Sequence, residues 1–117
     1  MSVYMNANNG NITIWNKSDL SKTITALSDY NVTIKRIHTS KEKMIEILFS
    51  ANFKDSKKKI DEIFTELSKL DIQFTMSFCK NTEKTKEFYT YENAGLVVLS
   101  SKEAILREKR EIYGNEN

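Results

Sequence analysis

Two stretches of this chain repeat one hydrophobic pattern, forty positions apart. The apolar positions of the two copies are, in order, Leu20, Ile24, Leu27, Tyr30, Val32 and Ile34, and then Ile60, Phe64, Leu67, Leu70, Ile72 and Phe74. Within each copy the spacing is first that of one helix face and then that of one strand face. A short strand pattern precedes each copy. The chain is therefore expected to contain two successive β-α-β units.

Alternation, capping residues and turn formers set the expected boundaries. They predict strands at 11–15, 32–38, 44–53 and 72–79, helices at about 18–30 and 55–70, a hairpin of 87–92 with 96–99, and a last helix from 100 to about 113. Residues 1–10 are rich in asparagine and are expected to form a loop. The alternation slips between Ile34 and Ile37, which predicts a bulge. Ser100 with Glu103 matches a capping box, and Gly114 is placed at the end of that helix.

The order βαββαβ constrains the topology. It satisfies the right-handed crossover rule as a four-stranded antiparallel sheet with two helices on one face. In element order and spacing, residues 11–79 resemble the ferredoxin-like fold. The expected class is α+β, with this core extended by a C-terminal hairpin and helix at about 86–114. No linker-like stretch interrupts the 117 residues, so residues 1–117 are expected to form a single domain.

Alternation also sorts the strand residues into two faces. The face expected under the helices is apolar: Ile12, Ile14, Val32, Ile34, Ile45, Ile47, Phe49, Ile72, Phe74, Met76 and Phe78. The opposite face is mostly polar, with Trp15 and Leu48 as its large apolar members. The run from Leu96 to Leu99 is apolar on both strand faces. It could pair at a sheet edge, cross the open face or form a dimer contact, and the sequence leaves these alternatives open.

Composition excludes several classes of protein. The net charge of +2 does not require a polyanionic partner, so any basic site must be local. The single cysteine, Cys79, cannot form an internal disulfide, which fits a reducing compartment. No apolar run reaches the ~20 residues of a membrane span, and the first residues lack the features of a signal peptide. A cytoplasmic location and no membrane partner are expected. Absence of proline and abundance of lysine, isoleucine and asparagine are typical of an AT-rich bacterial or phage genome.

Candidate catalytic chemistry is sparse. His38 is the only histidine, and neither it nor Cys79 has a sequence-local partner with metal-ligand or nucleophile-base spacing. The three glycines form neither a phosphate-binding loop nor a dinucleotide fingerprint. We therefore expect no catalytic residue, no metal site and no cofactor, and the protein is not expected to be an enzyme.

Basic and aromatic residues give the best candidate site. Lys54, Lys57 and Lys58 stand at the start of the second helix, where free backbone N–H groups can also bind an anion. Trp15, the only tryptophan, points away from the helices. Stacking of a base on its indole contributes ~1–3 kcal/mol. The alternatives are a solvated lysine run and a tryptophan packed under the C-terminal hairpin.

Further residues complete this candidate set. Lys35 and Arg36 could bracket a nucleic-acid strand beside the tryptophan, and Tyr89 on the hairpin is a second stacking candidate. In layout the chain is also similar to RNA-recognition motifs. Those domains carry paired aromatic residues and glycines on their first and third strands. Here the third strand has no glycine, and Glu46 lies on its exposed face.

The sequence therefore predicts a small, non-enzymatic regulatory protein that binds RNA or single-stranded nucleic acid. In size it resembles the small regulators that bacterial plasmids and phages carry. The alternative is a protein-interaction module, either a homodimer or an inhibitor of a larger protein. Such a module would use the exposed sheet face or an edge strand.

Overall fold

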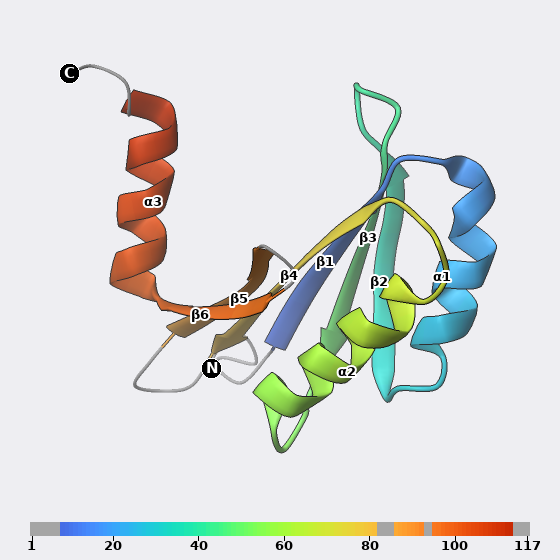
Figure 1. Ribbon diagram of the computed structural model, residues 1–117, viewed down its shortest axis with the longest axis horizontal. Coiled ribbons are helices and arrows are strands. Elements are labelled where there is room, and N and C mark those ends of the chain that lie inside the picture. The colour runs from blue at the N-terminus through green and yellow to red at the C-terminus, as the bar shows by residue number, and fades with distance from the viewer. Residues whose placement is uncertain (1–7, 82–85, 93–94, 114–117) are drawn as a thin grey trace.

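The computed structural model describes residues 8–81, 86–92 and 95–113, and within them it confirms the α+β class (Figure 1). The elements in chain order are β1 (Asn8–Ile14), a 3-10 turn (Lys17–Asp19), α1 (Leu20–Leu27), β2 (Val32–Thr39), β3 (Ile45–Ala51), α2 (Ser56–Ser68), β4 (Phe74–Asn81), β5 (Lys86–Glu92), β6 (Gly95–Ser100) and α3 (Ser101–Tyr113). The strands form one antiparallel sheet in the order β2-β3-β1-β4-β5-β6. Because β5 and β6 continue the sheet past β4, it differs from a simple four-stranded βαββαβ sheet.

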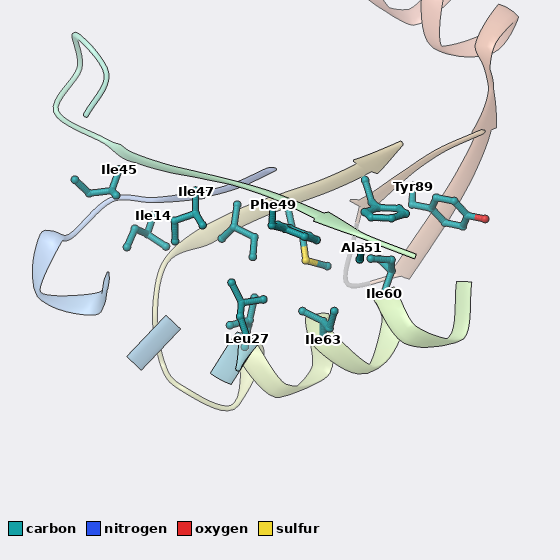
Figure 2. Packing of buried hydrophobic residues seen from close by; sticks show 13 residues of the cluster. Ile14, Leu27, Ile45, Ile47, Phe49, Ala51, Ile60, Ile63 and Tyr89 are labelled. Atoms are coloured by element: carbon teal, nitrogen blue, oxygen red, sulfur yellow. The ribbon is translucent and has the colours of Figure 1, made fainter. Parts of the chain in front are cut away.

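The repeat in the sequence corresponds to the units β1-α1-β2 and β3-α2-β4. Both helices pack on the same face of the sheet, as the apolar alternation predicts. Figure 2 shows Leu27 of α1 and Ile60 and Ile63 of α2 pointing at the sheet residues Ile47 and Phe49. Every residue that alternation assigned to this face lies in the buried cluster or packs against it.

The first strand begins at Asn8, so the loop expected over residues 1–10 is wrong from that point on; residues 1–7 lie outside the described part. Gly10 faces the helices and pairs with Phe49 of β3. A Cβ atom at Gly10 would lie 2.1 Å from Cζ of Phe49, because the ring covers the glycine. The Asn8 side chain accepts a hydrogen bond of 3.1 Å from the backbone N–H of Asn81 and ties β1 to the end of β4. Glycine and asparagine here serve packing rather than a turn.

Helix boundaries follow the capping residues. The Asp55 side chain accepts a hydrogen bond from the Lys58 N–H at 3.2 Å and caps α2, at the start of the expected range 55–70. The Ser100 hydroxyl oxygen accepts one from the Glu103 N–H at 3.2 Å, which confirms the predicted cap of α3. The first helix is shorter than the expected 18–30 and runs only over Leu20–Leu27. Gly114 and the hairpin turn at 93–94 lie outside the described residues.

The predicted hairpin adds to the sheet edge and does not cross the open face. Phe78 of β4 pairs with Tyr89 of β5, and β5 in turn pairs with β6. On the helix side, the Tyr91 ring stacks on Phe64 of α2 with ring centroids 3.6 Å apart. The ribbon of α3 lies on the opposite side of the sheet from α2 (Figure 2). No helix in the described ranges is long and apolar enough to cross a membrane.

Candidate nucleic-acid interface

The face of the sheet turned away from α1 and α2 is polar across its four N-terminal strands. Its residues alternate with the buried ones: Asn9, Asn11 and Thr13 on β1, Glu46, Leu48 and Ser50 on β3, and Thr75, Ser77 and Cys79 on β4. Apart from Glu46 and Leu48, these are neutral polar side chains that can take part in hydrogen bonds. The surface can thus contact the polar edges of a ligand, while its apolar contribution comes from Leu48 and Trp15.

Trp15 lies at one end of this face. It directly follows Ile14, which is fully buried and pairs with Ile45 and Phe74. Trp15 is the first residue beyond β1, and continuing the alternation past Ile14 predicts that its side chain turns to the open side. The residue is 42% exposed, which is unusual for so large an apolar side chain. The C-terminal hairpin continues the sheet beyond β4 and does not cover it.

Basic side chains lie along the β2 edge of the same face. The register of β2 against β3 shifts between Ile34 and Arg36, so the predicted bulge is confirmed. The shift leaves Lys35 as the extra residue and places Arg36 opposite Leu48, on the open side. Both basic residues are exposed. A ligand on the face would therefore meet the guanidinium of Arg36 at its border.

Two more lysines, which the sequence reasoning did not include, lie at the Trp15 end. Lys41 and Lys43 are exposed on the turn that joins β2 to β3. This turn leads into Ile45, the residue that pairs with Ile14, so it sits beside the end of β1 (Figure 1). The expected topology could have placed these lysines near Trp15. In a βαββαβ sheet, the turn between the second and third strands lies at the end of the sheet where the first strand finishes.

The lysines at the start of α2 belong to a different place. Lys54, Lys57 and Lys58 follow the end of β3 at which Ala51 pairs with Asn8, and α2 lies on the helix side. The seven residues of β1 separate this end from Trp15 by ~20 Å at the usual rise per residue. The structure does not bring the two predicted halves of the site together.

A surface hollow of about 330 Å³ lies beside the α2 lysines. Its lining consists of Asp55, Lys57, Lys58, Asp61 and Leu96. Two carboxylates share this hollow with the two ammonium groups, so it is not a purely basic site for an anion. Asp61 also accepts a hydrogen bond of 3.4 Å from the Tyr91 hydroxyl.

Tyr89 is placed in the core. It is 4% exposed and packs against Phe78 with ring centroids 6.1 Å apart, on the helix side of the sheet. A ring in this position offers no free face to a base. Tyr91, two positions along β5, lies on the same buried side and packs against the core.

The two residues with catalytic potential lie far apart. His38 on β2 forms a cross-strand pair with Glu46, with 3.1 Å between Nε2 and Oε1. Cys79 lies on β4, and β3 and β1 run between the two strands. Burial raises the pKa of the Cys79 thiol, although the charge of Lys86 acts in the opposite direction. A protonated thiol without a base nearby is a poor nucleophile.

Within the described ranges, no group of three or more His, Cys, Asp or Glu side chains is arranged to hold a metal ion. Comparison of the chain with protein-family models, with curated proteins and with solved structures finds no match.

Proposed function

We propose that this protein binds single-stranded nucleic acid, RNA or DNA, on the open face of its sheet. The observation that carries the proposal is the exposure of Trp15 at one end of a polar surface bordered by basic residues. Proteins that bind single strands combine a stacking platform with positive charge along the backbone path. In this proposal the indole of Trp15 stacks on a base, and Arg36 and Lys35 contact phosphates along the β2 edge.

The turn lysines Lys41 and Lys43 extend the basic border past Trp15. Glu46 lies on the same face, opposite Thr13, and its negative carboxylate would repel the phosphates that these basic residues attract. Affinity is therefore expected to be modest and strongly dependent on salt. The α2 lysines take no part in this path, and Tyr89 is left out because its ring is buried.

The fold and the cellular setting complete the proposal. The order β4-β1-β3-β2 of the first four strands supports a ferredoxin-like core over residues 8–81, to which β5 and β6 are an addition. A regulatory role, a cytoplasmic location and an origin in a bacterial mobile element are supported by size and composition alone and stay predictions.

Two charge-matched double variants test the site. One is Lys35→Ala with Arg36→Ala on the β2 edge, and the other is Lys57→Ala with Lys58→Ala on α2. All four side chains are exposed, so both variants should fold. Binding of a labelled single-stranded oligonucleotide is followed by fluorescence anisotropy over a range of salt concentrations.

The β2 variant is expected to lower the salt slope by about 1.4, since each phosphate contact to a single strand contributes about 0.7. The α2 variant should bind as the unchanged protein does. Trp15→Ala should weaken binding by the ~1–3 kcal/mol of one stacked base. Loss of binding confined to the α2 variant would move the site to the other end of the molecule, and no binding at low salt would end the proposal.

A further inference from the structure

The two edges of the sheet differ in how they discourage pairing with another strand. Natural edge strands are protected by charged residues and bulges. On β2, the bulge at Lys35 interrupts the ladder, and Lys35 and Arg36 are exposed beside it. The β6 edge has neither protection. Its residues, Gly95, Leu96, Val97, Val98, Leu99 and Ser100, carry no charge, and their register with β5 is regular.

An exposed apolar surface lies next to the β6 edge. The helix α3 follows β6 directly and makes its main contacts with β5 and β6. Arg107 of α3 forms an ion pair with Glu92 at the end of β5. Ile105 and Leu106 nevertheless remain 52% and 53% exposed, the largest values among the exposed large hydrophobic residues of the described part. Figure 1 shows α3 standing away from the rest of the molecule.

The geometry points to a homodimer in which β6 of one copy pairs antiparallel with β6 of a second copy. Such a pair is related by a two-fold axis perpendicular to the sheet, which is the commonest symmetry of soluble oligomers. Residues directly opposite each other must share a face, so the axis passes midway between a residue and its own image in the second copy, at Val97 or Val98. The sheets of the two copies then join edge to edge.

The same operation relates the two α3 helices, each of which follows the C-terminal end of its own β6. A two-fold axis perpendicular to the sheet keeps both copies the same way up, so both helices lie on the open side. Ile105 and Leu106 of each copy then have a neighbouring apolar surface to pack against. The proposed interface combines the backbone of β6 with the exposed apolar residues of α3.

Charge favours a second copy over another protein as the occupant. A strand that pairs with itself places like residues near one another, and like charges opposite each other are destabilising. The neutral β6 avoids this, whereas self-pairing of β2 would bring Lys35 and Arg36 close to their own images. On α3, Glu103 and Glu108 alternate with Lys102, Lys109 and Arg110, so antiparallel helices can place opposite charges together.

Sedimentation equilibrium of the full chain over a range of concentrations tests the inference. The expected result is a monomer-dimer equilibrium in the micromolar range. Val97→Lys introduces a charge at the axis and should raise the dissociation constant at least about tenfold. Ile37→Lys is the matched control, because Ile37 is 44% exposed on the other edge strand. It should leave the constant within about twofold, as expected for a surface change away from the interface.

A second variant separates loss of the dimer from loss of folding. Ile105→Glu with Leu106→Lys changes side chains that are already half exposed, so the circular dichroism spectrum should be retained while the dimer weakens. The thermal midpoint should also be retained at concentrations well below the dissociation constant, where both proteins are monomeric. A protein that stays monomeric at every concentration, or a dimer that Ile37→Lys alone weakens, would overturn the inference. Assembly beyond a dimer would overturn it too, because a two-fold contact closes. The inference does not depend on nucleic-acid binding.

Discussion

Replacement of Gly10 by alanine is expected to destabilise the fold by about 2 kcal/mol. The added Cβ atom would lie 2.1, 2.5 and 2.7 Å from three carbon atoms of the Phe49 ring. Carbon atoms in ordinary contact are about 3.5–4.0 Å apart, so the ring must withdraw by more than ~1 Å. Phe49 is 1% exposed and stacked on Phe78 with centroids 6.0 Å apart, which leaves it little room.

The magnitude combines two opposing effects. Overpacking of a filled core costs about 1–3 kcal/mol, and the three short contacts place Gly10→Ala near the upper end, at about 3 kcal/mol. Gly10 has no positive φ, so alanine can adopt its backbone conformation. Alanine also restricts the unfolded chain, and this effect stabilises the fold by about 0.4–1 kcal/mol and offsets part of the overpacking cost. For 117 residues the unfolding entropy is roughly 0.25 kcal/mol/K, so a net loss of about 2 kcal/mol lowers the thermal midpoint by about 8 °C.

Urea and thermal unfolding, followed by circular dichroism, measure this change. Asn9→Ala is the matched control, since Asn9 is exposed on the other face of β1 and should change stability by less than about 0.5 kcal/mol. Adding Phe49→Leu to the Gly10→Ala protein should cost less than the sum of the two single changes. If Gly10→Ala proves neutral or stabilising, the register that also directs Trp15 to the open face is wrong.

Three further changes test the described contacts. Ser100→Ala removes the cap of α3 and should lower local stability by about 1 kcal/mol, visible as faster amide hydrogen exchange in that helix; unchanged exchange would refute the capping role. Burial and the carboxylate of Asp61 raise the pKa of Tyr91, so the unfolded chain releases this proton first as pH rises past about 10, and stability should fall above that pH. Tyr91→Phe should make the urea midpoint less sensitive to alkaline pH, and an unchanged alkaline decline would argue against this origin. Glu46→Gln should tighten oligonucleotide binding about twofold at low salt, with Glu66→Gln on the helix side as the neutral control; a weaker complex would contradict the open-face site.

The core of the fold could be predicted because it depends on local periodicity. Apolar residues at helical and then at strand spacing identified both β-α-β units, and the slip after Ile34 identified the bulge. The cap of α3 by Ser100 could be predicted for the same reason, since a cap involves residues only three positions apart.

Features that depend on distant neighbours were not predictable in the same way. Gly10 suggested a turn, because nothing in the local sequence shows that the Phe49 ring will cover it. The run from Leu96 to Leu99 allowed three placements, and the sheet edge is the one observed. That placement packs Tyr91 on Phe64 and pairs Tyr89 with Phe78, contacts between residues far apart in the chain.

The candidate site was predicted residue by residue, but its assembly was not. Alternation placed Trp15 on the open side, yet an alternating pattern cannot say which side of a hairpin is buried, and this is why Tyr89 was grouped with it. Lys54 and Lys57 were grouped with Trp15 by charge, although the length of β1 lies between them. Lys41 and Lys43 were not included, because only the pairing of β3 with β1 shows that their turn lies near Trp15.

The most direct test of the proposed nucleic-acid face uses Trp15 itself, the one tryptophan of the chain. Its fluorescence is recorded while an unlabelled single-stranded oligonucleotide is added at low salt, and the titration is repeated at high salt. A base stacked on the indole should quench the emission at low salt, with the effect disappearing as salt rises. Binding detected by anisotropy without any change in tryptophan emission would contradict the account, since the strand would then lie elsewhere on the protein.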